Sequence, residues 1–298
     1  MKDSREFSVI IFTLVCLSWG SIWLAVKVGL RFLPPFTFAG ISFATPVLGL
    51  LLIAKLLHAR FPKDRSSWIA MIFLGIIGIG ASFGFTFWGE QYVSSGLSAV
   101  LFGTAPFFVV IFAHFLIEEQ KVTRWKILGI AISFAGMLAI FWHQLTFTFT
   151  GNTQSSLYGA FAEVASAACA AMGIIIYKRF CAEIDNLVTL LVQTVVGSVF
   201  LLFLGLVWET SSIFDFSPLA IAAIICLGLG TTLPFIGYYW LLEKTTVINV
   251  SMTTFITPIL ALFLGWILLG EQLAGNTLLG AMLILTGLYL TVGFVNYH

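Results

Sequence analysis

Two stretches of this chain share an uncommon pattern, in which a proline interrupts a long apolar run and an acidic residue followed by glutamine closes it. Pro106 and Pro258 occupy the same place in the two stretches, 152 positions apart, and the same step carries Trp88 onto Trp240. The matched stretches are 102–120 (FGTAPFFVVIFAHFLIEEQ) and 254–272 (TFITPILALFLGWILLGEQ), and with one residue less between the copies Gly129 and Gly136 match Gly280 and Gly287. The chain is therefore predicted to consist of two related halves.

The apolar runs are too many and too long for a water-soluble core. Hydrophobic residues make up 60% of the 298 residues and charged residues 9%, whereas soluble domains carry roughly 25% charged residues. A spanning helix needs about 20 mostly apolar residues, and charged or Pro-, Gly- and Asn-rich breaks separate ten such segments. We predict an all-α polytopic membrane protein with ten transmembrane helices, at 7–30, 36–57, 67–89, 93–117, 125–142, 156–177, 186–208, 218–241, 246–269 and 275–295.

Several classes of function are excluded by what the sequence lacks. The net charge of +1 gives no reason to expect nucleic acid as a partner. The four cysteines have no metal-ligand spacing, and we find no cluster of His, Asp and Glu, no GxSxG motif and no phosphate-binding loop. We therefore predict no enzyme activity, no metal and no cofactor, and we expect the partners to be a small-molecule substrate and the lipid bilayer.

The basic residues predict an orientation. With the N-terminus in the cytoplasm, twelve Lys and Arg residues fall on the cytoplasmic side and only Lys27 and Arg31 fall on the other, which satisfies the positive-inside rule. Both termini are then cytoplasmic. Each half, 7–142 and 156–295, contains five helices, and because five is an odd number the second half enters the membrane from the opposite side. The halves are predicted to form an inverted repeat.

Inverted repeats within one chain are typical of secondary transporters, in which two halves enclose a cavity near the middle of the bilayer and rock about it. This arrangement predicts alternating access of a substrate site. The alternative is a channel-like facilitator or a lipid scramblase without ion coupling, which would show a continuous polar groove.

Four segments carry a resemblance to a known family: SWGSIWLAVKVG (18–29), GEQYVSSGLSAVLFGTAPFF (89–108), EEQKVTRWKILGIAISFAG (118–136) and TPILALFLGWILLGEQLAGNTLLGAMLILTG (257–287). They resemble the two EamA repeats of the drug/metabolite transporter superfamily, over nearly the whole chain. The resemblance implies ten helices in a bacterial inner membrane and the export or facilitated passage of small metabolites, with amino acids as the best-represented class. The sequence departs from the family at Ser42, where the relatives often have Arg.

The two matched prolines are candidate hinges. A proline has no N–H, so the carbonyl group one turn earlier loses its helical partner, and inside a membrane such breaks survive where protein or a water-filled cavity satisfies them. We interpret Pro106 and Pro258 as hinges that expose backbone carbonyls to a substrate, and a static kink is the alternative. Pro234 has no counterpart, since Ser82 stands opposite, and it predicts a local kink.

Glu163 is a candidate binding residue. It lies about 10 Å below the predicted outer surface at 1.5 Å per residue, where an ionisable group is costly. Its helical neighbours are Gly, Ala and Ser, so this face must either meet another helix closely or line a space. We interpret Glu163 as the site for a ligand amine or for a proton, with a structural hydrogen bond to a neighbouring helix as the alternative.

Lys27 and Glu90 are predicted near the outer ends of two helices. They are gate candidates, because a salt bridge between them would close the outer mouth. The alternative is that both side chains extend to the membrane interface.

Aromatic residues gather where a cavity is expected, and we predict that they bind substrate: Trp19, Trp23, Phe83, Phe87 and Tyr238. Trp19 falls near the middle of the bilayer, where anchoring at the interface cannot explain it. Such a pocket would suit an apolar or aromatic amino acid, with rings around its side chain and carbonyl groups on its amine. The alternative is that these rings face lipid or fill space.

Overall fold

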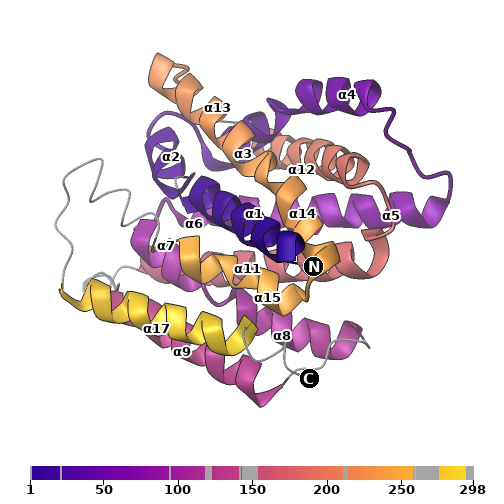
Figure 1. Cartoon of the computed structure of the whole chain (residues 1–298). Coiled ribbons are helices and arrows are strands. Elements are labelled where there is room, and N and C mark those ends of the chain that lie inside the picture. The colour runs from indigo at the N-terminus through magenta and orange to yellow at the C-terminus, as the bar shows by residue number, and fades with distance from the viewer. Residues whose placement is uncertain are drawn as a thin grey trace.

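The computed structural model describes residues 2–20, 22–93, 95–117, 123–140, 142, 154–210, 214–257, 259 and 275–292, and within them it is all-helical (Figure 1). The first half contains α1 (Lys2–Gly20), α2 (Ile22–Gly29), α3 (Pro35–Ala44), α4 (Val47–Leu56), α5 (Arg65–Leu74), the π-helix η1 (Gly75–Ala81), α6 (Ser82–Gly89), α7 (Ser95–Phe102), α8 (Ala105–Leu116) and α9 (Arg124–Ile140). The second half contains α11 (Gln154–Ile176), the π-helix η2 (Tyr177–Cys181), α12 (Asn186–Trp208), α13 (Pro218–Thr232), α14 (Pro234–Lys244), α15 (Val247–Ser251) and α17 (Gly275–Val292).

Consecutive elements join into apolar spans that follow the predicted segments. Seven helical stretches of the described residues are long and apolar enough to cross a membrane: Phe7–Gly29, Pro35–Leu56, Arg65–Gly89, Leu97–Leu116, Ser155–Cys181, Asn186–Trp208 and Pro218–Lys244. The shorter apolar helices Val247–Thr257 and Leu279–Thr291, together with α9, lie within the remaining predicted segments. The prediction of an all-helical membrane protein is confirmed.

Two of the helix breaks occur at prolines, which lack the backbone N–H group that a helix needs. Pro234 separates α13 from α14, as the predicted kink requires. In the first half, α7 ends at Phe102 and α8 begins at Ala105, so the chain is interrupted just before Pro106. The second predicted hinge, Pro258, lies outside the described residues.

Equivalent helices of the two halves pack in opposite directions. A Cβ atom on Gly129 of α9 would lie 2.5 Å from the carbonyl oxygen of Gly287 in α17, and one on Gly136 would lie 2.6 Å from that of Gly280. Because 129 meets 287 while 136 meets 280, α9 and α17 are antiparallel, and Figure 1 shows them side by side. The sequence repeat pairs Gly129 with Gly280 and Gly136 with Gly287, so the two contacts are copies of each other, as an inverted repeat requires.

Helices α3 and α12 also pack in opposite directions. Ser198 donates a hydrogen bond to the Gly40 carbonyl (2.8 Å), and at the end of α12 the Glu209 carboxylate accepts bonds from the backbone N–H groups of Phe36 (2.7 Å) and Thr37 (2.9 Å). Those N–H groups are free of helical partners at the start of α3, where the helix dipole also favours negative charge. Glu209 therefore locks the two helices together at one end.

Candidate functional site

A cavity of about 140 Å³ lies where the two halves meet. Its walls come from α1 and α2, from α5, η1 and α6, from α7 and α8, from α11 and α12, from α13 and α14, and from residues 253–257. A cavity of roughly this size in a protein core holds a benzene-sized molecule. The geometry therefore offers room for a small organic molecule between the halves.

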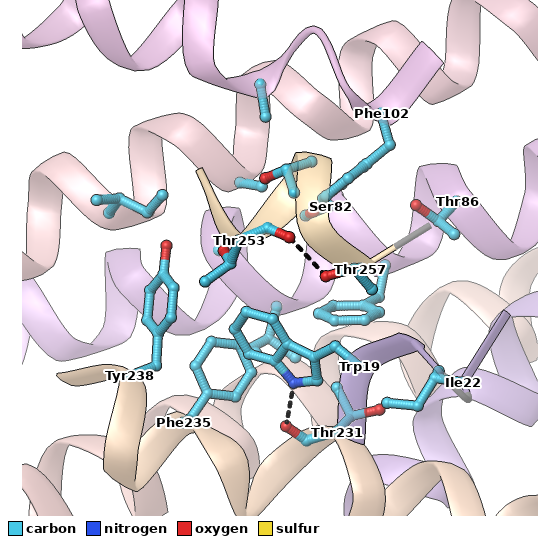
Figure 2. Close-up of a pocket in the computed structure, with 18 of the residues that line it drawn as sticks. Trp19, Ile22, Ser82, Thr86, Phe102, Thr231, Phe235, Tyr238, Thr253 and Thr257 are labelled. Atoms are coloured by element: carbon cyan, nitrogen blue, oxygen red, sulfur yellow. Dashed lines mark hydrogen bonds between the residues drawn. The ribbon is translucent and has the colours of Figure 1, made fainter. Parts of the chain in front are cut away.

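Five of the six residues that the sequence predicts to bind substrate line this cavity. They are Trp19, Trp23, Phe83, Phe87 and Tyr238. The Trp19 ring packs against Tyr238 and Phe235, with ring centroids 5.0 and 5.1 Å apart, and Figure 2 shows these rings on one side of the cavity. Phe83 also packs against Phe43 at 4.7 Å. The sixth residue, Glu163, is fully buried and does not line the cavity.

The lining follows the internal repeat. The step of 152 positions relates η1 and α6 to α13 and α14, and it pairs Phe83 with Phe235, Thr86 with Tyr238 and Phe102 with Thr254. A step of 151 positions relates α1 and α2 to α11. Residues paired by either step line the cavity together: Ile79/Thr231, Phe83/Phe235, Thr86/Tyr238, Phe87/Tyr239, Phe102/Thr254, Ala105/Thr257, Trp19/Ala170, Ile22/Gly173 and Trp23/Ile174. The cavity therefore lies on the pseudo-twofold axis of the molecule.

The cavity lining contains few polar groups, and most of their hydrogen atoms already form hydrogen bonds within the protein. The hydroxyl groups of Thr253, Thr254 and Thr257 donate to the backbone carbonyls of Val250 (2.9 Å), Ser251 (2.8 Å) and Thr253 (2.6 Å), in that order. Their oxygen atoms keep lone pairs that can accept a hydrogen bond from a ligand. Among the described residues that line the cavity, none is Asp, Glu, Lys or Arg.

Two hydrogen-bond donors of the lining, on Gln193 and Tyr238, remain unused. Gln193 accepts a short hydrogen bond from the Tyr239 hydroxyl, and its buried Nε2 group has no partner among the described residues. The Tyr238 hydroxyl also makes no hydrogen bond within the part of the chain that the structure describes. A bound molecule with one acceptor group and one apolar body would satisfy both these donors and the apolar lining.

Hydrogen bonds from helix α1 stabilise the helix break at Pro234. Pro234 cannot bond to the carbonyl of Gly230, one turn earlier, and the Ser18 hydroxyl donates to this carbonyl instead (3.0 Å). Next to it, Trp19 Nε1 donates to the Thr231 carbonyl (3.2 Å), which Figure 2 shows as a dashed line. The Ser-Trp pair of the first helix thus fixes the kink in α13 and α14 and sets the Trp19 ring against the cavity.

The gate candidates contact each other through the backbone. Lys27 Nζ donates to the carbonyl oxygens of Glu90 (2.5 Å) and Val93 (2.8 Å), just beyond the end of α6. The Glu90 carboxyl group is fully buried, so it does not extend to the membrane interface, and no ion pair with Lys27 is formed. The lysine instead neutralises the negative end of the helix dipole.

The second half repeats this contact. Lys178 Nζ donates a short hydrogen bond to the carbonyl of Leu242 in α14. Lys27 corresponds to Lys178 at the 151-position step, and Glu90 corresponds to Leu242 at the 152-position step. We name these two contacts, Lys27 on Glu90 and Lys178 on Leu242, the lysine clamps. Sequence reasoning missed the second clamp, although the internal repeat held the signal.

Glu163 lies behind the cavity, where α11 meets α6. A Cβ atom on Gly89 would lie 3.0 Å from the Gly159 carbonyl oxygen and 3.1 Å from Glu163 Oε1. The small-residue face of this helix therefore meets another helix closely, which was one of the two expectations. Thr86 Oγ1 donates to Glu163 Oε2 at 3.5 Å and shares a 2.7 Å hydrogen bond with Ser166 Oγ.

Comparison with known proteins gives one family. The model described as "EamA-like transporter family" matches residues 6–142 and again residues 157–293. The chain is 30% identical over 280 residues to "Uncharacterized transporter YoaV" of Bacillus subtilis, covering 93% of each chain. It is 25% identical over 290 residues to "Uncharacterized inner membrane transporter YedA" of Escherichia coli, covering 91% of this chain and 88% of that one. A solved crystal structure shares the fold, with a TM-score of 0.78 at 16% identity over 95% of this chain and 97% of the other.

Proposed function

Because this chain belongs to the EamA-like transporter family, we propose that it carries small amphipathic metabolites, amino acids first among them, across a bacterial inner membrane by alternating access. The observation that carries the proposal is the twofold-related lining of the central cavity. When the lining is built from equivalent residues of inverted halves, exchanging the conformations of the halves turns the same cavity from one face of the membrane to the other.

The composition of the cavity supports the substrate class. Aromatic rings from Trp19, Trp23 and Tyr238 form walls for an apolar side chain, and the cavity of about 140 Å³ fits a small molecule. Threonine oxygens on one wall accept hydrogen bonds from an amine, while Gln193 Nε2 and the Tyr238 hydroxyl donate to a carboxylate. Few and well-placed polar groups in an otherwise apolar site are typical of small-molecule recognition.

The lysine clamps are the proposed gates. Lys27 holds the end of α6, and Lys178 holds the equivalent end of α14, so one clamp lies at each end of the molecule. Breaking one clamp while keeping the other would open the cavity to one side only. The interruption before Pro106 in α7 and α8, and the matched Pro258, are the proposed hinges. The proposed orientation has both termini in the cytoplasm, which puts the Lys27 clamp outside and the Lys178 clamp inside.

The test is transport by purified protein in liposomes. A thermal-shift screen of the natural amino acids and nucleobases identifies the compound that stabilises the protein most, and the flux of that compound is then measured with and without the same compound on the opposite side. We expect saturable flux that is accelerated by countertransport. Flux that rises linearly with concentration and shows no countertransport would instead identify a channel-like facilitator.

Two variants place the site. Trp19→Ala should abolish the thermal shift by the ligand, because it removes the central ring of the cavity. Phe203→Ala is the matched control, since Phe203 is an aromatic residue of α12 that is 59% exposed on the outside of the helix bundle. Equal ligand responses in the two variants would remove the cavity from the mechanism.

A further inference from the structure

Two buried carboxyl groups are not used by the cavity. The side chains of Glu90 and Glu163 are both 0% exposed. Both carboxylate oxygens of Glu90 and Oε1 of Glu163 make no hydrogen bond of normal geometry within the described residues, and the buried Ser98 hydroxyl, which has no other partner there, is near Glu163. Buried polar groups are nearly always hydrogen-bonded, so three unpartnered oxygens in one region indicate that something else is bound there.

Glu163 lies beside the residue that precedes Glu90 in the chain. Glu163 Oε1 lies against Gly89, as the 3.1 Å distance to a Cβ atom on that residue shows, and Glu90 follows directly in the chain. The charged groups of the described residues that act on Glu163 are Glu90 and Lys27. Lys27 already donates to two backbone carbonyls and contributes to this cluster through its charge alone.

The charges of this cluster do not balance. With all three groups ionised, two carboxylates face one ammonium group, which leaves a net charge of −1 in a fully buried place. An uncompensated charge in the interior of a membrane protein is strongly unfavourable. One proton bound by either carboxyl group removes this excess, as in other sites where nearby like charges cannot both ionise.

A chain of hydroxyl groups connects the cluster with the cavity. Thr86 and Ser82 line the cavity. The single hydroxyl hydrogen of Thr86 points either to Glu163 (3.5 Å) or to Ser166 (2.7 Å). When it points to Glu163, Ser166 donates to Thr86, and when it points to Ser166, Ser166 donates to the Ser82 carbonyl (2.7 Å). A hydroxyl group both donates and accepts, so Thr86 offers a route for a proton between water in the cavity and Glu163.

We propose that Glu90 and Glu163 together bind one exchangeable proton, beside Lys27 and within reach of the cavity through Thr86. A proton from water in the cavity adds to one carboxylate oxygen, which leaves a single carboxylate to balance the charge of Lys27, and the proton leaves by the same route. Its use to drive transport rests on the proposed function, but the binding itself does not. Through linkage, any substrate that changes the affinity for this proton has its own affinity changed by the proton to the same extent.

The test is infrared difference spectroscopy of the substrate-free protein in lipid while the pH is stepped. We expect the carbonyl-stretch band of one protonated carboxylic acid per protein, lost as the pH rises. Glu90→Gln and Glu163→Gln should each remove the band at neutral pH, because the remaining carboxylate is then balanced by Lys27. Lys27→Gln should roughly double the band and move its loss to higher pH. Glu183→Gln, at an exposed position near the other end of the molecule, is the control and should leave the band unchanged.

The inference is overturned if wild-type protein shows no such band, if either single Gln variant keeps it, or if it responds to Na⁺ at constant pH. Wild-type spectra alone are decisive where a Gln variant does not fold. Because no substrate is present, a normal band with no transport would count against the proposed function only, and normal transport without the band would count against the proton site only.

Discussion

The antiparallel contact between α9 and α17 makes a quantitative prediction for Gly136→Ala. The added methyl group would lie 2.6 Å from the Gly280 carbonyl oxygen and 2.9 Å from Leu283 Cβ. Normal contacts of carbon begin near 3.5 Å, so the helices would have to separate by roughly 0.5–1 Å, which loses a quarter to a half of the dispersion energy of each facing atom pair. Over a few tens of pairs at about 0.1–0.2 kcal/mol each, the loss is about 1–3 kcal/mol, the usual range for overpacking.

Lipid gives little to offset this loss, because helix association in a bilayer depends on close packing. The measurement is the free energy of unfolding by SDS titration from mixed micelles, with helical content followed by circular dichroism. Gly49→Ala is the matched control: Gly49 also lies within a helix, α4, but a Cβ atom there meets nothing within 4 Å. If the two variants differ by less than about 0.5 kcal/mol, the close approach of α9 and α17 is not what holds the halves together.

Three further variants test the contacts of the fold and the site. Glu209→Gln should lower the free energy of unfolding by about 1–3 kcal/mol, since it removes the charge that accepts from Phe36 and Thr37; Asp215→Asn, at an exposed side chain nearby, should not. Ser18→Ala should lower the free energy of unfolding by about 1–3 kcal/mol, because it leaves the Gly230 carbonyl unpaired. This loss should be smaller in the Pro234→Ala background, where the helix again supplies an N–H group to that carbonyl. An unchanged loss would disprove the role of Ser18 at the kink. Tyr238→Phe should weaken substrate binding about tenfold, or 1.4 kcal/mol, without changing stability, as read from ligand titrations of the thermal shift.

The sequence predicted the architecture because membrane helices and repeats leave strong local signals. Pro106 and Pro258, with Trp88 and Trp240, fixed a register that also relates the two walls of the cavity. The five aromatic side chains predicted to bind substrate all line one cavity. This was predictable because a tryptophan expected near the middle of the membrane, such as Trp19, has few roles other than packing around a space.

The sequence could not predict the contacts that depend on the direction of a side chain. Whether Glu163 faced the cavity or the neighbouring helix depended on the rotation of α11, and the glycines on both helices that decide it (Gly89 and Gly159) fit either reading. The pairing of Ser18 with the carbonyl freed by Pro234 joins residues more than 200 positions apart, and nothing in either local sequence specifies the other. The partner of Lys27 was not predicted, because the sequence suggested the Glu90 carboxylate or the membrane interface and the observed acceptors are the backbone carbonyls of Glu90 and Val93.

The two lysine clamps are equivalent in the repeat but differ in their surroundings, and this difference predicts different behaviour. Glu90 and Glu163 are buried beside Lys27, whereas Glu243, which follows Leu242 at the other clamp, is exposed and accepts a hydrogen bond from Asn186 (2.7 Å). Among the described residues, buried carboxyl groups thus accompany the Lys27 clamp and not the Lys178 clamp, so a proton should change the charge balance mainly at the Lys27 clamp. Lys27→Gln should shift the pH dependence of flux to higher pH, because the pair then holds its protons more tightly, while Lys178→Gln should change the rate equally at all pH values. The measurement is liposome flux of the stabilising amino acid across a pH series; a pH shift of the same size in both variants would show that the acidic pair does not act through its neighbouring clamp.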